Sequence, residues 1–246
     1  MNSNSVADGS ARYGFDAPGV MIGLITGAAA GVGLGIVLQY FFLSQIVSWL
    51  SFLIFIGAGV IGVLGLSMLL YGLVGKLRVR DFMVDSLALK GNEQVLDIGT
   101  GRGLLAIGIA KKLNTGKVIG IDMWSAKDLT GNTIENAHAN AAVEGVSDRV
   151  DVQTADASTL HFSDGVFDAV ASQFAIHNIE PEDAHRKACF EMARVLKPGG
   201  IVLLGDYIPT HTYANWLSEA GLKVAYSRNF IMLAFSLTWI ARATKT

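Results

Sequence analysis

The stretch that decides the fold is Val95-Leu96-Asp97-Ile98-Gly99-Thr100-Gly101-Arg102-Gly103. An apolar run followed by three alternating glycines predicts a buried strand, a tight turn and the start of a helix. Glycines in such a turn let the backbone approach a ligand, and the free N–H groups of the following helix face it. A dinucleotide-binding loop would need glycine at position 104, which is leucine. The turn therefore predicts a ligand site, but by itself it does not identify the ligand.

One carboxylate lies just before this turn and a second ends the next apolar run. Asp97 lies two residues before the first glycine, where a carboxylate can face a cationic amine. Asp122 ends the next apolar run, 23 residues after Gly99, where a carboxylate can accept hydrogen bonds from both hydroxyls of a ribose. The alternatives are a plain strand-to-helix turn and a solvated strand end.

From residue 76 onward, short apolar runs alternate with longer mixed segments, which predicts an α/β fold with a mostly parallel sheet covered by helices. We expect strands at residues 94–98, 117–121, 150–154, 167–172, 201–205, 223–227 and 239–244. We expect helices at residues 78–89, 104–113, 133–143, 182–196 and 213–220, with Lys197-Pro198-Gly199-Gly200 breaking the chain after the fourth. The apolar residues 230–240 are too short to span a bilayer, so they either dip into its interface or form a buried hairpin.

The chain has 246 residues, of which 16% are charged, against about 25% in typical soluble domains. The deficit is regional, because residues 18–75 contain no Asp, Glu, Lys, Arg or His. As one helix this stretch would extend about 87 Å, against a hydrocarbon core of about 30 Å. We therefore expect a transmembrane helical hairpin with spans at about 20–38 and 49–71, between a polar leader (1–17) and a soluble-type domain (76–246).

A cleaved signal peptide would be shorter and would follow a basic start, whereas helices buried in a soluble core remain an alternative. Lys76, Arg78 and Arg80 follow the second span. The positive-inside rule then predicts an integral protein of the cytoplasmic (inner) membrane, with the domain and both termini on the cytoplasmic side.

Small residues recur along both predicted spans. Gly23, Gly27, Gly31 and Gly35 repeat every four residues in the first, and Ala58, Gly62, Gly65 and Gly72 form a strip in the second. Such strips let helix backbones approach closely. We expect the two strips to pack within the hairpin; the alternative is a homodimer formed through them.

Composition excludes several classes of protein. The net charge is −2, so the cationic excess that drives sequence-independent nucleic-acid binding is missing. Cys189 is the one cysteine, so neither an internal disulfide nor a cysteine-rich metal site is expected.

Five segments, in this order, resemble the motifs of class I S-adenosylmethionine-dependent methyltransferases. They are residues 97–103, 119–122, 154–157, 167–172 and 194–200, the last reading Arg194-Val195-Leu196-Lys197-Pro198-Gly199-Gly200. The resemblance covers essentially all of residues 76–246 and is closest to the small-molecule branch, similar to quinone and sterol methyltransferases. It implies a Rossmann-like, mostly parallel seven-stranded sheet with helices on both faces, and S-adenosylmethionine as the cofactor.

The resemblance also implies roles for individual residues. Asp97 and the glycine loop would hold the methionine part of the cofactor, Asp122 the ribose, and Met123 would pack on the adenine. Asp156 with the backbone of Ala157 would read the adenine edge, although a turn or helix cap is a simpler role for Asp156. The expected cofactor-binding residues are thus Asp97, Gly99, Thr100, Gly101, Gly103, Asp122, Met123, Asp156, Ala157 and Ser172.

Methyl transfer is an in-line displacement, so it needs a base only where the acceptor must lose a proton. His177 lies in the segment that faces the transferable methyl group in the related enzymes. Its ordinary pKa near 6.5 suits a general base, and packing of the loop is the alternative. Asp206, with Tyr207, follows a predicted strand and is expected beside the acceptor.

The acceptor is expected to be a small apolar or lipid-like molecule. A double proline after the fourth strand, usual in related enzymes that methylate nucleic-acid and protein amides, is missing here, and so are the cysteines of arsenite methylation. A membrane-tethered site suits a quinone or isoprenoid, a lipid headgroup, or a hydrophobic thiol or phenol. A non-catalytic S-adenosylmethionine-binding sensor or assembly factor is the main alternative, and a nicotinamide-dependent oxidoreductase is a third.

Overall fold

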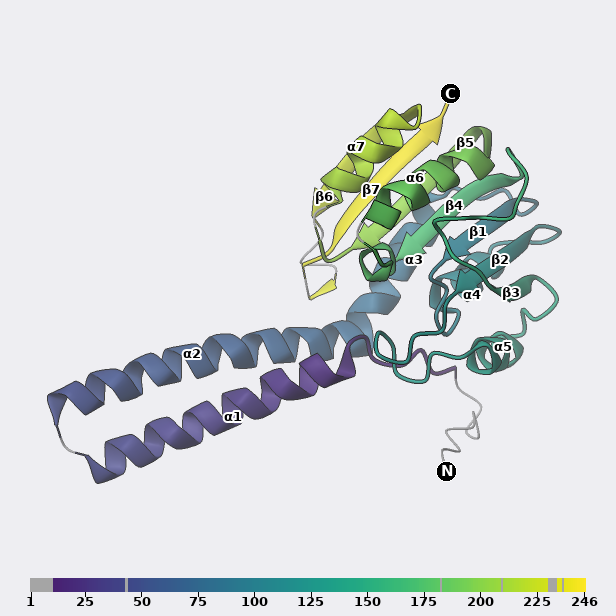
Figure 1. Ribbon diagram of the computed structural model, residues 1–246. Coiled ribbons are helices and arrows are strands. Elements are labelled where there is room, and N and C mark those ends of the chain that lie inside the picture. Colours follow the sequence, from purple (N-terminus) through teal and green to yellow (C-terminus); the bar gives the residue numbers. More distant parts are fainter. Residues whose placement is uncertain (1–10, 43, 182, 209, 230–233, 236) are drawn as a thin grey trace.

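In the computed structural model of the chain, residues 11–42, 44–181, 183–208, 210–229, 234–235 and 237–246 are described here. A twisted sheet with the strand order β3-β2-β1-β4-β5-β7-β6 forms the centre of the domain (Figure 1). Strand β7 pairs antiparallel with β5 and β6, whereas the other neighbours are parallel. The expected mostly parallel seven-stranded sheet is confirmed. Its strands are β1 (Gln94–Ile98), β2 (Lys117–Asp122), β3 (Val150–Thr154), β4 (Phe167–Gln173), β5 (Leu196–Asp206), β6 (Leu222–Asn229) and β7 (Trp239–Lys245).

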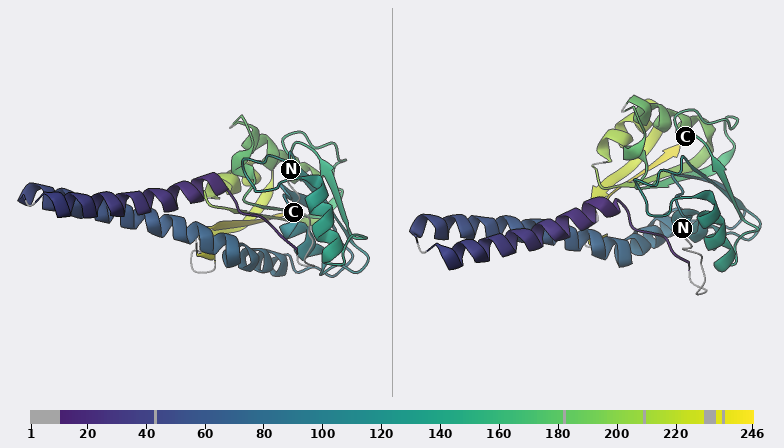
Figure 2. Two further views of the ribbon diagram at one scale, coloured as in Figure 1. Left: turned by 90° about the horizontal axis from the view of Figure 1, so that it is seen from below. Right: turned by 60° about the horizontal axis from the view of Figure 1, so that its bottom comes forward.

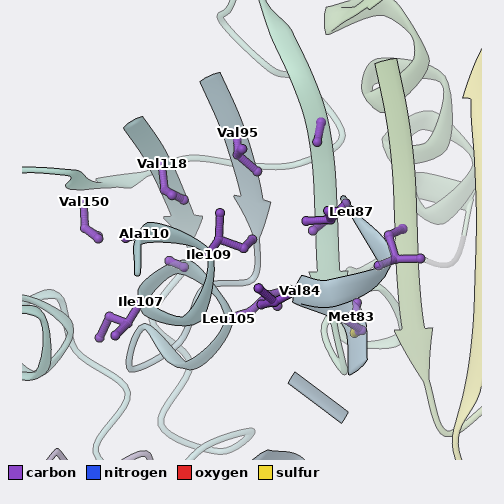
Figure 3. Packing of buried hydrophobic residues seen from close by; sticks show 14 of the residues in the cluster. Met83, Val84, Leu87, Val95, Leu105, Ile107, Ile109, Ala110, Val118 and Val150 are labelled. Carbon is purple, nitrogen blue, oxygen red and sulfur yellow. The ribbon is translucent and has the colours of Figure 1, made fainter. Parts of the chain in front are cut away.

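Two apolar cores lie on opposite faces of this sheet because side chains alternate along each strand. On one face, Val95 of β1 packs against α3 and α4, as Figure 3 shows. On the other face, Leu96 and Ile98 pack against α6 and α7. The domain helices are α3 (Lys76–Ser86), α4 (Leu104–Ala110), α5 (Ile134–Val143), α6 (Asp183–Val195) and α7 (His211–Glu219), with a short 3-10 helix, η2 (Ile176–Asn178).

The predicted elements are all present, and several of their ends differ from the prediction; for example, α3 ends at Ser86 and α4 at Ala110, each three residues earlier than predicted. Helix α6 ends at Val195 and strand β5 begins at Leu196, so the Lys-Pro-Gly-Gly segment is the first part of a strand and not a separate loop. Helix α3 starts at Lys76 and continues directly from the hairpin. Of the apolar segment 230–240, residues 230–233 and 236 lie outside the described part. Ala234 is buried beside Gly75, and the ring of Phe235 covers the Arg78 guanidinium at 4.8 Å.

The charge-free stretch forms two long antiparallel helices that project from the domain (Figures 1 and 2). Helix α1 covers Pro18–Phe41 and helix α2 covers Gln45–Leu70. A π-helical turn, η1 (Tyr71–Gly75), joins α2 to α3 without a break. Both α1 and the α2–α3 unit contain apolar stretches long enough to cross a membrane, and most of their large apolar side chains are exposed.

The packing between α1 and α2 corrects part of the glycine prediction. Gly31 faces Ala58, Gly35 faces the ring of Phe55, and Gly62 faces Ala28. A Cβ added at Gly23 or at Gly27 would have no neighbouring atom within 4 Å. Residues four apart advance about 40° beyond one full turn, so a strict four-residue repeat rotates away from the partner. The real contact positions are spaced by three and four residues.

Residues 11–17, which we call the leader strap, pack on the α/β domain. Arg12 donates its backbone N–H to Asn140 Oδ1 and accepts from Asn140 Nδ2, both at 2.9 Å. Asp16 forms an antiparallel bridge with Leu129, and the backbone N–H of Ala17 donates to Asp128 O at 2.9 Å. The strap fixes the start of α1 against the domain, so the base of the hairpin has a defined position.

Candidate active site

A cavity of about 1050 Å³ opens at the carboxyl ends of β1, β2 and β4. Ligands bind at this edge in open α/β sheets, where the chain leaves two neighbouring strands in opposite directions. Here those strands are β1 and β4, paired with Ile98 opposite Ser172. The volume is at the upper end of the range of about 300–1,000 Å³ for small-molecule sites. The cavity therefore has the size of a small-molecule site.

The glycine loop between β1 and α4 forms one wall of this cavity. Gly99, Gly101 and Gly103 all have positive φ angles, of 71°, 53° and 84°. An added Cβ at Gly99 would lie 2.0 Å from Ala175 Cβ, so this position requires glycine. Gly99 and Gly101 line the cavity. Gly103 does not; it is the residue before the first turn of α4.

Asp97 is buried on this wall. Its Oδ2 accepts a hydrogen bond from the backbone N–H of Ala106 at 3.0 Å, and its Oδ1 has no hydrogen-bond partner in the described structure. Burial, with a smaller contribution from the charge of Asp122, raises the pKa of Asp97 to about 7. An unpartnered buried carboxylate oxygen is costly, so a donor-bearing, preferably cationic, ligand group would stabilise it.

Asp122 organises the neighbouring wall. Its Oδ2 accepts from the backbone N–H of Gly101 at 2.8 Å, and its Oδ1 accepts from the backbone N–H of Trp124 at 2.6 Å and from Asn132 Nδ2 at 3.1 Å. Asp122 also lines the cavity. The carboxylate therefore shapes the glycine loop and faces the ligand space at the same time.

Comparison with known proteins identifies the domain. Residues 95–200 match a family model described as a methyltransferase domain. The ubiquinone/menaquinone biosynthesis C-methyltransferase of Geotalea daltonii is 30% identical over 129 residues, which cover 52% of this chain and 51% of that protein. This chain spans about half the length of the first curated relatives it matches.

Two solved structures share the fold. Geranyl diphosphate methyltransferase in complex with S-adenosylmethionine has a TM-score of 0.56 at 14% identity, over 69% of this chain and 85% of that chain. A cyclase has a TM-score of 0.59 at 20% identity, over 69% of this chain and 81% of that chain. The chain carries a class I S-adenosylmethionine-dependent methyltransferase domain.

S-adenosylmethionine is the cofactor of such a methyltransferase domain, and the cavity fits it. Its α-ammonium group would supply a cationic donor for Asp97 Oδ1. Thr100, on the same loop, also lines the cavity. The sulfonium cofactor supplies an activated methyl group at this edge of the sheet.

The three residues that were predicted to contact the adenine all line the cavity. Met123 is 66% exposed and lines the cavity, together with Asp156 and Ala157. Asp156 Oδ1 accepts from the backbone N–H of Ser158 at 2.8 Å, so this side chain also caps a turn. Among the described residues, no group of three or more His, Cys, Asp or Glu side chains is placed to hold a metal ion.

The structure gives Ser172 a different position from the one expected. Ser172 is buried and does not line the cavity. Its hydroxyl donates to Ile98 O at 2.8 Å, so the residue fastens β4 to β1. Ser172 is the last residue of the fourth motif and was expected beside the cofactor, but its hydroxyl binds the neighbouring strand and the next residue, Gln173, lines the cavity.

His177 lies on η2 and lines the cavity. Its Nδ1 is 2.8 Å from Asp206 Oδ1. Asp206 is only 1% exposed and does not line the cavity, so it lies behind the imidazole. The ring of Tyr207 meets the imidazole edge-on, with 4.5 Å between ring centroids, and burial together with the Asp206 charge raises the pKa of the Tyr207 hydroxyl.

Sequence reasoning missed the part of the cavity lining that comes from the leader strap, the hairpin and the start of α3. Asp16 of the leader strap, Val20 of α1, and Met68, Tyr71 and Lys76 of the α2–α3 unit all line the same cavity. Lys76 Nζ lies 3.7 Å from Asp16 Oδ2 and donates to Tyr13 O at 3.1 Å. One signal was available: Asp16 and Lys76 are the charges nearest the two ends of a charge-free hairpin, and an antiparallel hairpin brings such positions together.

Proposed function

We propose that this protein is a membrane-anchored S-adenosylmethionine-dependent methyltransferase that methylates a small apolar or lipid-like acceptor. The observation that carries the proposal is the shared cavity, in which residues at the base of the apolar hairpin line the same space as the cofactor loop. A molecule that partitions into a bilayer would meet the methyl donor at this junction.

Asp97, Gly99, Thr100 and Gly101 would hold the methionine part of the cofactor. Asp122 would accept hydrogen bonds from the ribose hydroxyls, and Met123 would pack on the adenine. Asp156 and Ala157 would read the adenine edge. The unpartnered oxygen of Asp97 and the alignment of these residues along one cavity support this arrangement.

His177 would act on the acceptor. Where the acceptor loses a proton as its bond to the methyl carbon forms and the methyl–sulfur bond breaks, the imidazole can take that proton. Asp206 lies 2.8 Å from Nδ1, which would favour a proton on that nitrogen and leave Nε2 as the nitrogen that accepts the proton. Most of the rate enhancement would come from holding the acceptor in line with the methyl group.

The small-molecule class of the acceptor is supported by relatives whose printed names specify such substrates. They include the quinone C-methyltransferase described above and a 27-O-demethylrifamycin SV methyltransferase from Amycolatopsis mediterranei, 34% identical over 53% of this chain and 44% of that protein. The exposed apolar surface of α1 and α2 supports the membrane anchor. Lys76, Arg78 and Arg80, next to the hairpin, support a cytoplasmic domain in the inner membrane.

The test uses the full chain in lipid nanodiscs with methyl-labelled S-adenosylmethionine and extracted membrane lipids. Release of S-adenosylhomocysteine, with one lipid-soluble molecule gaining the mass of a methylene unit, is the expected result. Asp97→Asn serves as the cofactor-site control. Tight cofactor binding without turnover on any lipid, quinone or thiol pool would overturn the enzyme proposal in favour of a cofactor-binding sensor, because the fold is shared with a cyclase and does not fix the reaction.

A further inference from the structure

Two hydrogen-bond acceptors on the hairpin side of the cavity are buried and accept no hydrogen bond in the described structure; one of them also lies 3.7 Å from the ammonium group of Lys76. They are Oδ2 of Asp16, from the leader strap, and Oε1 of Gln173, from the carboxyl end of β4. The Asp16 side chain as a whole is 34% exposed, and both residues line the cavity. A buried acceptor without a donor costs free energy, so a ligand group that donates to it is favoured.

The orientation of the Gln173 amide is fixed by its neighbours. Its Nε2 donates to the carbonyl oxygen of Lys76 and to the hydroxyl oxygen of Tyr71, both at 3.3 Å. A carbonyl oxygen can only accept, so the amide nitrogen must face Lys76. The amide oxygen is therefore the atom left without a partner.

The two acceptors are connected through the base of the hairpin. Lys76 accepts from Gln173 through its backbone carbonyl, and its ammonium group lies beside Asp16. The ammonium group also donates hydrogen bonds to the carbonyl oxygens of Tyr13 and Gly14. Val20 of α1 and Met68 of α2 supply apolar lining on the same hairpin.

We propose that Asp16 and Gln173 bind the head group of the methyl acceptor, and that this head group carries hydrogen-bond donors, as a phenolic hydroxyl does. The apolar part of the acceptor lies along Val20 and Met68. This inference rests on the proposed function and narrows its acceptor class. An oxidised quinone offers only acceptor oxygens, and a phosphate group would bring its negative charge to Asp16, so neither satisfies the two oxygens.

The experiment compares two probes that differ in one donor. The full chain in nanodiscs is titrated with 1-naphthol and with 1-methoxynaphthalene, and empty nanodiscs correct for partition into lipid. Because a hydrogen bond to a charged group contributes about 1.5–3 kcal/mol, we expect 1-naphthol to bind about 10-fold or more tightly than its methyl ether.

Two variants remove the acceptors, Asp16→Asn and Gln173→Leu. Each is expected to weaken 1-naphthol binding about 5-fold or more and to leave the methyl ether unaffected. Matched controls are Asp148→Asn and Gln153→Leu, which lie outside the cavity lining and should bind both probes as the parent protein does. S-adenosylmethionine affinity should be unchanged in all four, which shows that the domain is folded.

Equal affinity for the two probes, or unchanged 1-naphthol binding in Asp16→Asn and Gln173→Leu, would overturn this inference even if methyl transfer is observed. Discrimination between the probes without turnover on any membrane extract would overturn the transferase proposal and support the donor-binding site. The two failures are therefore distinguishable.

Discussion

Replacing Asp122 by alanine tests whether one carboxylate both shapes the loop and binds the cofactor. The substitution removes the acceptor of three donors, which are the N–H groups of Gly101 and Trp124 and the amide of Asn132. It would also remove the acceptor for the ribose hydroxyls. Loss of those charge-assisted hydrogen bonds predicts a cofactor affinity lower by about 1–3 kcal/mol, or about 5- to 150-fold in Kd.

The variant Asp122→Asn separates the two roles. Oδ1 serves two protein donors and Oδ2 serves one, so the amide oxygen is expected at the Oδ1 position and the amide nitrogen opposite Gly101. Trp124 and Asn132 then keep their partner, whereas Gly101 loses its own. We expect the unfolding temperature of Asp122→Asn to be closer to that of the parent protein than the unfolding temperature of Asp122→Ala is. Its affinity for S-adenosylmethionine should be reduced nearly as much as that of Asp122→Ala.

Isothermal titration with S-adenosylmethionine measures the affinity, and thermal unfolding without ligand measures the stability. Asp151→Ala is the matched control, because Asp151 is an exposed carboxylate on the adjacent strand with one side-chain partner, Gln153. Its affinity should equal that of the parent. An unchanged Kd in Asp122→Ala would refute the reasoning and remove Asp122 from the cofactor site.

Three further predictions concern other parts of the molecule. His177→Ala should slow methyl transfer by about 100-fold or more if the imidazole is a general base, with cofactor affinity intact; a rate within a few-fold of the parent would indicate a packing role. Because the pKa of Asp97 is about 7 in the fold and 3.8 ordinarily, its protonated form stabilises the fold at low pH, and that contribution is lost as pH rises from about 4 to about 7. A cationic ligand offsets the loss, so the increase in Tm caused by S-adenosylmethionine should be larger at pH 8 than at pH 6, and Asp97→Asn should remove the difference. Gly31→Leu should disturb the hairpin, because an added Cβ already lies 2.9 Å from Ala58 Cβ, whereas Gly27→Leu should not; cross-linking between α1 and α2 measures this, and equal effects would contradict the packing described.

The sequence was sufficient for features that depend on local chemistry. The glycine loop was predicted because positive φ angles and close packing demand glycine at that spacing, and the sheet was predicted because apolar runs and breaks alternate regularly. It was not sufficient for side-chain direction. Ser172 and Gln173 are neighbours in one strand, yet only Gln173 reaches the cavity. The four-residue glycine repeat was wrong for Gly23 and Gly27 because a helix has 3.6 residues per turn.

The contribution of the hairpin to the site was also missed, because it depends on how α2 enters the domain. The chain runs from α2 through η1 into α3 without a flexible linker, and α3 is packed into the core through Met83 and Val84 (Figure 3). The hairpin is thus fixed relative to β1 and β4. A flexible tether would only raise the local concentration of a membrane-dissolved acceptor, whereas a rigid one also sets its orientation. Because in-line displacement depends on orientation, the π-helical turn that places Tyr71 and Lys76 on the cavity wall would link the proposed membrane anchoring to catalysis.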